Sequence, residues 1–346
     1  MKKSSLVIIA LLLTLALISI YIYVSKSKLS TVDKDERAFA FKDTAAITKI
    51  FIADKEGGQS TIVRTKQGWV VNNKFNCRSD AILNLLEVIK HVEVKMAVPK
   101  LGKPSVLKFM ASGALKVEIY AGDDLVKQYY VGYESNDNEG SYMLLTNIKT
   151  GKNYENPFIC FIPGFMGYLM PRYITKENEW RDRLVINYTP PQIKQIKVRH
   201  FDMPADSSFT IDLLNTTTFK LSNAKNQNMV FDEAKMKQYL AYFQNISYEA
   251  LITNKNKRLQ DSLSLQQPFC IISLLGIDAK THEYKFYRKA FDGDVNPEIG
   301  VTYTYDPDRL YLRFDNDKEW AAIQYFVFGK LLMTSNYFLP PISVKK

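Results

Sequence analysis

A run of uncharged residues near the amino terminus constrains this chain more than any other feature. Residues 6–24 (LVIIALLLTLALISIYIYV) carry no charge, whereas Lys2 and Lys3 precede them and Lys26 and Lys28 follow. At about 1.5 Å per residue, a helix of this length measures roughly 28 Å, close to the hydrocarbon thickness of a bilayer. We therefore expect one transmembrane helix from Leu6 to Val24, which ties the protein to a membrane.

A cleaved signal peptide is the alternative interpretation of this run. Signal peptides end in small residues at the cleavage site, but this run ends in bulky residues, among them Tyr21 and Tyr23. The two tyrosines also suit the aromatic belt where a helix leaves the bilayer. No cysteine precedes Cys77, which excludes a lipid-modified amino-terminal cysteine. A retained anchor is the favoured interpretation.

The charges that flank the run do not decide its orientation. Two lysines precede it, and four basic residues follow it within a short distance: Lys26, Lys28, Lys34 and Arg37. A short polar head usually stays in the cytoplasm while a long following domain is translocated. We therefore expect the body of the protein to lie outside the cytoplasm.

Composition describes a globular body and limits its partners. Hydrophobic residues make up 46% and charged residues 24% of the chain, as in folded proteins. The net charge of +10 would favour anionic lipid head groups or acidic envelope polymers. No basic block with interleaved aromatic residues occurs, so we expect no binding of nucleic acid. About 300 residues follow the run, enough for two domains.

Strand and helix patterns begin at Ile47. Ile47, Ile50 and Ile52 open a first strand, and two more strands are expected over residues 60–64 and 69–71, with turns at Gly57-Gly58 and Gln67-Gly68. A helix with one apolar face follows, for which Ser79 or Asp80 would be the amino-terminal cap. Its apolar positions are Ile82, Leu85, Leu86, Ile89 and Val92. Val94, Met96 and Val98 then alternate as a strand.

The same pattern returns in the second half of the chain. A shift of 154 residues moves the five helical positions onto Met236, Tyr239, Leu240, Phe243 and Ile246. A shift of 146 residues moves the first strand onto Ile193, Ile196 and Val198. We therefore predict an α+β fold with two similar units that have antiparallel sheets, produced by a duplication. The expected layout is an anchor over 1–25, a linker over 26–43, and units over 44–187 and 188–346.

Several phrases of the first half resemble domain-of-unknown-function family 4340, a family of uncharacterised membrane-anchored proteins of Bacteroidota. They include ITKIFIADKEG from Ile47, GWVVNNKFNCRSDAILNLLEVIKHVEVKMAVPK from Gly68 and IPGFMGYLMPRYIT from Ile162, followed by EWRDR. The resemblance covers about residues 35–200. It implies a single-pass inner-membrane protein with a periplasmic body, and it supplies no catalytic residue. Some related proteins resemble auxiliary parts of ABC transport systems, which hints at the partners.

The residues that chemistry usually needs are sparse. The histidines His91, His200 and His282 lie far from one another and from any cysteine at ligand spacing. No G-x-S-x-G, HExxH or P-loop motif is present, so we predict no enzyme, cofactor or metal. Cys77, Cys160 and Cys270 have no CxxC spacing and are expected to be unpaired, buried residues.

Two acidic loops invite comparison with calcium sites. They span residues 134–140 and 292–298, and the second places oxygen atoms at alternate positions, as Ca²⁺ prefers. Pro297 occupies the place where an EF-hand loop needs glycine, so solvated hairpin tips are the favoured interpretation. Two triplets, Asp43-Thr-Ala45 and Asp261-Ser-Leu263, resemble acceptor sequences for O-glycans.

The least ordinary stretch lies between Phe158 and Tyr173, where Pro163-Gly164 interrupts a run too short for a second span. One interpretation is a buried strand that leads into a short helix. The other is an exposed aromatic surface that binds protein, edged by the polar residues around Trp180. The residues of this possible interaction surface are Phe161, Phe165, Tyr168, Arg172, Tyr173 and Trp180.

These observations favour a non-enzymatic envelope protein that acts as an interaction or scaffold module. A protein partner in the envelope and the membrane itself are the expected partners. The alternatives are an auxiliary subunit of an ABC-type transport or cell-surface machinery, and an envelope hydrolase, which would need a cleft where titratable groups converge.

Overall fold

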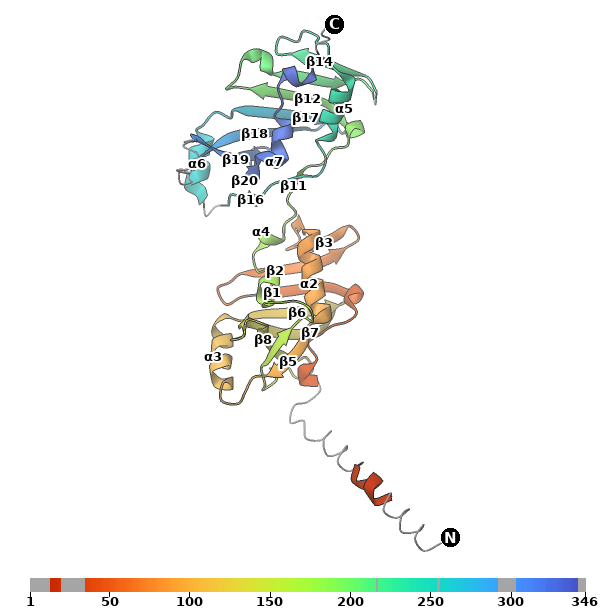
Figure 1. Ribbon diagram of the computed structural model, residues 1–346, viewed down its shortest axis with the longest axis vertical. Helices are drawn as coiled ribbons and strands as arrows, with labels where there is room; N and C mark the ends of the chain where they lie inside the picture. The colour runs from red at the N-terminus through yellow and green to blue at the C-terminus, as the bar shows by residue number, and fades with distance from the viewer. Residues whose placement is uncertain (1–12, 20–34, 216, 254–255, 292–302, 342–346) are drawn as a thin grey trace, which may run out of the picture. The chain divides into compact units, whose positions relative to one another are not determined.

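The computed structural model describes residues 13–19, 35–215, 217–253, 256–291 and 303–341 (Figure 1). The chain divides into two units, Met1–Asp182 (unit 1) and Arg183–Lys346 (unit 2). This boundary precedes the expected one at residue 187, because strand β11 (Leu184–Ile186) pairs with β15 (Ile246–Ser247) inside unit 2. Both units combine helices with antiparallel sheets, which confirms the predicted α+β class.

The expected span from Leu6 to Val24 falls mostly outside the described residues. Residues 13–19 of it form a helix with exposed apolar side chains. Within the described ranges, no helix has both the length and the apolar character to cross a membrane. The transmembrane helix therefore stays a prediction.

Unit 1 contains one antiparallel sheet of ten strands. Nine of them follow one another through hydrogen-bonded neighbours, and β9 (Lys152–Asn153) pairs with β8 outside that path. In sheet order the nine are β4 (Phe75–Asn76), β3 (Gly68–Val71), β2 (Gln59–Thr65), β1 (Ile47–Ala53), β6 (Leu115–Ala121), β7 (Asp124–Glu134), β8 (Ser141–Asn147), β10 (Phe158–Phe161) and β5 (Glu93–Ala97).

The first strands form where the period-2 pattern predicts them. Ile47, Ile50 and Ile52 of β1 are fully buried, because their side chains point into the core. The expected turns are also present: Gly57 has φ +91° between β1 and β2, and Gly68 has φ +129° at the start of β3. Both values favour glycine, which has no side chain to clash in this region.

Helix α2 (Ser79–His91) covers one face of the sheet, which we call the inner face. It buries Ile82, Leu85 and Ile89, as their spacing predicts, against the strand residues of the same core. The predicted cap is wrong: Arg78 occupies the N-cap position and no side chain caps the helix. Asp80 instead pairs with Arg78, with 2.5 Å between Oδ2 and Nη2.

Unit 1 begins earlier than the sequence indicates. Residues 35–43, expected as part of a linker, contain the short helix η1 (Asp35–Arg37) and lead into η2 (Thr44–Ala46). Phe39 is 1% exposed and packs edge-on against the rings of core aromatic residues. The Glu36 carboxylate is buried, and it accepts hydrogen bonds from the backbone and side chain of Asn156, which compensate for the loss of water.

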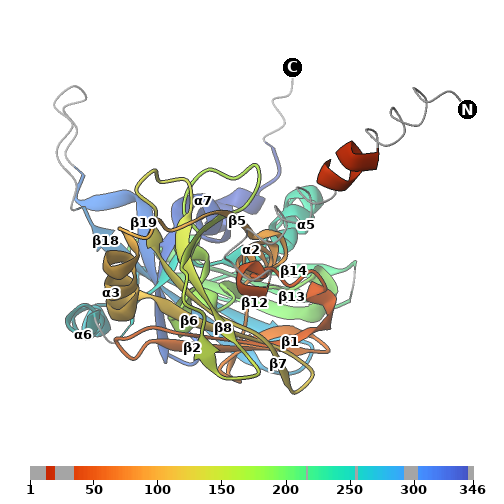
Figure 2. The same ribbon diagram turned by 90° about the horizontal axis from the view of Figure 1, so that it is seen from below.

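Helix α3 (Lys103–Gly113) covers part of the opposite, outer face of the sheet. Met110 of this helix packs against Leu144 of β8 and Tyr130 of β7, whose side chains alternate with the core-facing ones. Figure 2 shows strands β6 and β8 between α3 and α2. The outer face of β10 and β5 lies beyond α3.

The stretch after β10 follows the first of its two interpretations in outline. Buried strand β10 runs into the Pro163-Gly164 turn, where Gly164 has φ +79°. The short helices η3 (Met170–Arg172) and α4 (Glu177–Trp180) then close the unit.

Unit 2 contains an eight-stranded antiparallel sheet and the β11–β15 pair. In sheet order its strands are β14 (Phe219–Asn223), β13 (Phe209–Leu213), β12 (Ile193–His200), β17 (Cys270–Gly276), β18 (Thr281–Ala290), β19 (Tyr305–Phe314), β20 (Glu319–Gln324) and β16 (Ala250–Leu251).

The helices of unit 2 cover both faces of its sheet. Helix α5 (Glu233–Ala241) starts at the N-cap Asp232, whose side chain accepts two backbone N–H groups, and it packs into the larger core. Helix α6 (Lys257–Ser264) packs Leu263 against Tyr287 and Trp320 in a separate cluster. The remaining short helices are η4 (Pro190–Gln192), η5 (Ala205–Ser207), α7 (Tyr325–Phe328), η7 (Gly329–Leu331) and η8 (Ser335–Phe338).

Candidate functional site

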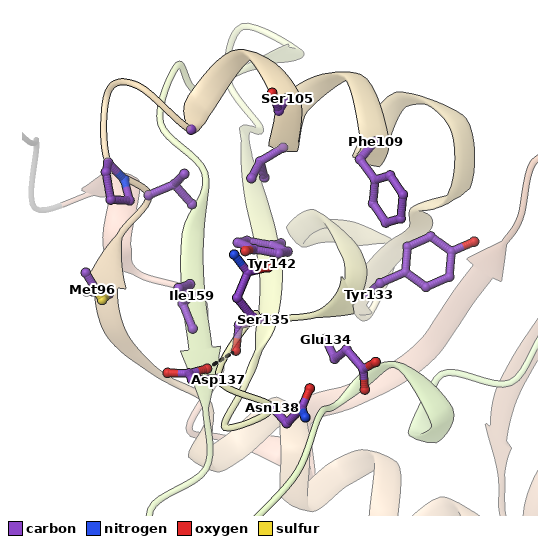
Figure 3. A pocket seen from close by; sticks show the side chains of 15 residues that line it. Met96, Ser105, Phe109, Tyr133, Glu134, Ser135, Asp137, Asn138, Tyr142 and Ile159 are labelled. Carbon is purple, nitrogen blue, oxygen red and sulfur yellow. Dashed lines mark hydrogen bonds between the residues drawn. The ribbon is translucent and has the colours of Figure 1, made fainter.

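A groove with a volume of about 860 Å³ lies on the outer face of the unit 1 sheet (Figure 3). Its floor consists of Met96 from β5, Tyr142 from β8 and Ile159 from β10. Phe109 and its neighbours on α3 form one wall. The hairpin between β7 and β8 closes one end. The volume lies within the usual range for ligand sites, and the lining is mainly apolar.

The wall of the groove depends on how α3 packs. Met110 anchors the helix on the sheet, and the adjacent Phe109 is 54% exposed and points toward Tyr133 (Figure 3). Its ring lies 5.0 Å from that of Tyr133, which is 41% exposed. Tyr133 lies close to Gly113, where a Cβ atom would be only 2.4 Å from the tyrosine hydroxyl. The glycine thus makes room for this aromatic pair.

The hairpin at the end of the groove is held by one carboxylate. Asp137 accepts hydrogen bonds from the Ser135 hydroxyl at 2.5 Å and from Lys95 Nζ at 2.7 Å. Lys95 also pairs with Glu139. The hydrogen bonds from Lys95 and Ser135 hold the pKa of Asp137 well below its ordinary value, so this carboxylate is ionised at neutral pH.

The same lysine pairs with two carboxylates of the first acidic loop, whose sequence invites comparison with a calcium site. Lys95 occupies the position next to Asp137 that a cation would need, and the described residues contain no group of three or more acidic, histidine or cysteine side chains that could hold a metal. The second loop, residues 292–298, lies outside the described residues.

Glu134 gives the groove an unneutralised charge. Its side chain is exposed and lines the groove, as Figure 3 shows. No hydrogen bond or ion pair to its carboxylate is found among the described residues. Asn136 and Asn138 contribute amide groups to the same rim. The groove therefore combines an aromatic wall and apolar floor with a negative, hydrogen-bonding end.

The structure divides the predicted aromatic surface into two parts. Phe165 and Tyr168 are 37% and 40% exposed, and the Arg172 guanidinium lies 4.1 Å from the centre of the Phe165 ring. Phe161 is half-buried. Tyr173 and Trp180, in contrast, are 2% and 0% exposed. Including these two in an exposed surface is wrong.

The burial of Trp180 and Tyr173 has a clear cause. The indole N–H of Trp180 donates to the carbonyl of Ile174 at 2.8 Å, so its polar group is satisfied inside the unit. Tyr173 packs edge-on against Tyr129, and the hydroxyl groups lie 3.1 Å apart. Both rings belong to the inner core of unit 1.

A second hollow joins the predicted surface to the groove. It has a volume of about 440 Å³ and includes Tyr168 as well as Tyr133. Because Tyr133 also lines the groove, the two hollows share this residue. The acidic Asp54 and Glu56 also line the second hollow. The second hollow thus connects the exposed part of the predicted surface to the groove through the ring of Tyr133.

Sequence reasoning missed most of the groove. Its residues come from β5, α3, β7, β8 and β10, and no spacing along the chain predicts that these segments meet. The one available signal was the hairpin, which the acidic loop marks. Helix α3 itself has Pro104 in its first turn, a common start signal for a helix.

The histidines lie apart, each in a structural setting. His91 is half-buried on α2, with Nε2 3.5 Å from the Glu87 carboxylate, and His282 lies near the ring of Tyr188. His200 is buried, with Nε2 3.1 Å from the carbonyl oxygen of Met333.

The three cysteines are free thiols. Cys160 and Cys270 are buried as predicted, whereas Cys77 is half-buried. Burial raises the pKa of the Cys77 and Cys270 thiols to about 12. They are therefore protonated and unreactive at neutral pH.

The two O-glycan triplets lie on helices. Thr44 belongs to η2 and Ser262 to α6. Their modification stays a prediction.

Comparison with known proteins gives no match: no family model, no curated protein and no solved structure resembles this chain closely enough to count as one.

Proposed function

We propose that this protein is a non-enzymatic interaction module of the cell envelope, and that the unit 1 groove binds a segment of a partner protein. In this proposal residues 6–24 anchor the chain in the inner membrane and the body lies in the periplasm. The similarity of the first half to domain-of-unknown-function family 4340 is part of the same proposal.

The exposed aromatic groove is the observation that carries the proposal. Met96, Phe109 and Tyr133 leave between 41% and 54% of their surface in contact with water around one hollow. Exposed aromatic residues and methionine are enriched where proteins bind one another. The adjoining Phe165 and Tyr168 extend this apolar area.

Charge indicates the kind of segment that fits. Lys95 pairs with both Asp137 and Glu139 and offsets one of their two negative charges, and Glu134 adds an unpaired carboxylate beside the aromatic wall. A segment with one bulky apolar side chain and a neighbouring lysine or arginine would place the first on the floor and the second at Glu134. The exposed Phe109 and Tyr133 rings would also attract that cation.

We also propose that the two units arose by duplication. Support comes from strand order: β3-β2-β1-β6-β7-β8-β10-β5 in unit 1 has the same succession as β14-β13-β12-β17-β18-β19-β20-β16 in unit 2. Helices α2 and α5 follow corresponding strands, and so do α3 and α6. The buried Ile82 and Ile89 of α2 correspond to the buried Met236 and Phe243.

The two alternatives are an auxiliary transporter subunit, which needs a partner that hydrolyses nucleotide, and an envelope hydrolase, which needs no protein partner. As an auxiliary transporter subunit, the protein would co-purify with a nucleotide-hydrolysing complex. An envelope hydrolase finds less support, because the groove lining contains no histidine or cysteine. The hydroxyl of Ser135 in this lining donates a hydrogen bond to Asp137 within the turn.

Site-specific cross-linking in native membranes tests the proposal. A photo-reactive phenylalanine analogue at Phe109 should form a cross-link to a partner protein, identified by mass spectrometry of the joined peptides. The matched control is the same analogue at Leu83, which is 62% exposed on α2, away from the groove. A cross-link at both positions, or at neither, would contradict a partner bound in the groove.

Charge reversal then tests the chemistry of the partner. The Glu134→Lys variant should lose the cross-link at Phe109, because a basic residue of the partner would be repelled. Glu87→Lys, on the surface of α2, should leave it unchanged. ATP hydrolysis by the cross-linked partner would favour the transporter alternative.

A further inference from the structure

A turn of unit 1 exposes a leucine between two lysines. In the segment between β5 and α3, Leu101 is 97% exposed, and Lys100 and Lys103 flank it. The turn has a fixed shape, since the N–H groups of Gly102 and Lys103 both donate to the carbonyl of Pro99, at 2.9 and 3.0 Å. Such exposure of a leucine on an ordered turn suggests a partner surface.

This turn lies close to the short helix η1, with which the globular part of unit 1 begins. Lys103 Nζ is 3.1 Å from the side-chain oxygen of Asn156, and Asn156 in turn donates to the buried carboxylate of Glu36. Residue 35 is the first described residue after the gap that follows residue 19. The start of η1 is therefore linked to the start of α3 through the side chain of Asn156, which contacts both Glu36 and Lys103.

A second turn with the same composition lies at this end of the sheet. Between β8 and β9, Ile148 is 44% exposed, next to the exposed Lys149 and Lys152. Asn147 fixes the turn by accepting the N–H groups of Lys149 and Thr150. The end of β8 also meets the segment that leads to Asn156, because the N–H of Tyr154 donates to the carbonyl of Leu145.

Charge at the two turns is positive. Lys100, Lys149 and Lys152 are exposed, and none of them has an ion pair within the described residues. Among the acidic residues at this end of the sheet, Glu36 is buried and bonded to Asn156, whereas Asp35, Asp124 and Glu155 are exposed. Each turn thus presents one branched apolar side chain close to two lysines in the sequence. This combination suits the interface of a bilayer, where anionic head groups cover an apolar interior.

The length of the preceding chain limits the distance to the anchor. Ten residues, 25–34, separate the end of the predicted span from Asp35. Even fully extended, they reach at most about 36 Å. An anchor ending at Val24 would therefore keep this end of unit 1 close to the bilayer.

We propose that these two turns rest on the membrane. Leu101 and Ile148 enter the interface of an anionic phospholipid bilayer, and Lys100, Lys149 and Lys152 contact phosphate head groups. The lysine stems can lie along the acyl boundary while their charges remain in water. This inference rests on the proposed anchor from Leu6 to Val24, and it orients unit 1 with the turns at the lipid and the β7–β8 hairpin end of the groove away from it.

Depth-dependent quenching of a site-specific label tests this orientation. The full chain, with Cys77→Ser to remove the half-buried thiol, is reconstituted in vesicles of phosphatidylethanolamine and phosphatidylglycerol. A fluorophore is attached to Leu101→Cys or Ile148→Cys, and lipids with nitroxide groups near the head group serve as quenchers. The matched control is Met166→Cys, which is 90% exposed and follows the other end of β10. Ile18→Cys reports on the anchor.

The expected result is strong quenching at positions 18, 101 and 148 and none at 166. Replacing phosphatidylglycerol by phosphatidylcholine should weaken quenching at 101 and 148 but leave it at 18, because only the turns depend on anionic lipid. Quenching at 18 without quenching at both turns would overturn the inference while the anchor stands. Absence of quenching at 18 would instead refute the proposed anchor and the inference with it.

Discussion

The hydroxyl groups of Tyr129 and Tyr173 lie 3.1 Å apart in the core of unit 1, and their rings meet edge to face at a centroid distance of 6.1 Å. One residue belongs to β7 and the other follows η3, 44 positions later. Burial raises the pKa of both tyrosines, so both hydroxyl groups stay protonated and can share one hydrogen bond. The pair therefore connects the segment after η3 to strand β7 of the sheet.

Removing one hydroxyl of this pair should destabilise the protein measurably. Tyr173→Phe leaves the Tyr129 hydroxyl buried without its partner, which costs about 1–3 kcal/mol of the free energy of unfolding. Urea denaturation followed by tyrosine and tryptophan fluorescence measures the loss. Tyr168→Phe is the control, because Tyr168 is 40% exposed and water can replace its contacts. Equal effects of the two substitutions would contradict the buried pair.

The two parts of the predicted aromatic surface should respond differently to truncation. Phe165→Ala and Tyr168→Ala each remove a side chain that is more than a third exposed, and should cost less than about 1 kcal/mol. Trp180→Ala leaves a cavity in the core and should cost about 3–5 kcal/mol. Thermal unfolding of the three variants checks this order. A large loss from Phe165→Ala would assign that ring to the core.

A close backbone approach makes one glycine sensitive. A Cβ atom at Gly140 would lie 2.6 Å from the carbonyl oxygen of Cys160, which belongs to neighbouring β10. Gly140→Ala should therefore push β8 and β10 apart and cost about 1–3 kcal/mol. At Gly102 the nearest atom to an added Cβ is 3.7 Å away, so Gly102→Ala should be neutral. Unfolding midpoints in urea that do not differ would contradict this prediction.

The hydrogen bonds that Asp137 accepts from Lys95 and Ser135 should make the stability of the protein depend on pH. Its pKa in the folded protein lies below the ordinary 3.8, so its contribution to stability is complete above pH 3.8 and is lost as the pH falls through the folded value. Wild type should exceed Asp137→Asn in melting temperature at about pH 6, and the difference should shrink toward about pH 3. Lys95→Gln should show the same trend, since it removes the first cause of the shift. A constant difference across this range would contradict it.

Local patterns predicted the parts of the fold that local physics controls. Ile82, Leu85 and Ile89 share one helix face at the predicted spacing, and Ile50 and Ile52 alternate into the core. The predicted cap failed because Arg78 takes the N-cap position and neutralises Asp80 instead. The residue preferences for the N-cap position do not take into account an ion pair such as the one between Arg78 and Asp80.

The site depended on contacts that no sequence pattern contains. Tyr173 and Phe165 are both aromatic residues of one short stretch, yet only Tyr173 finds a buried partner, Tyr129. The groove likewise exists because α3 covers β7 and β8 but not β10 and β5. Composition therefore indicated an aromatic surface in this region, whereas the tertiary contacts decide which rings belong to it.

The proposed duplication places two large buried side chains at corresponding positions of the two units. Ile89 of α2 and Phe243, just after α5, are both fully buried, each in the core of its own unit. Ile89→Ala should cost about 2–5 kcal/mol and Phe243→Ala about 3–5 kcal/mol, because each leaves a cavity. Hydrogen exchange measured by mass spectrometry should show lost protection in β1 and β6 for the first variant, and in β12 and β17 for the second. Leu83→Ala, on the exposed face of α2, is the control and should change neither. Equal loss of protection in both units from either core substitution would contradict two separate cores.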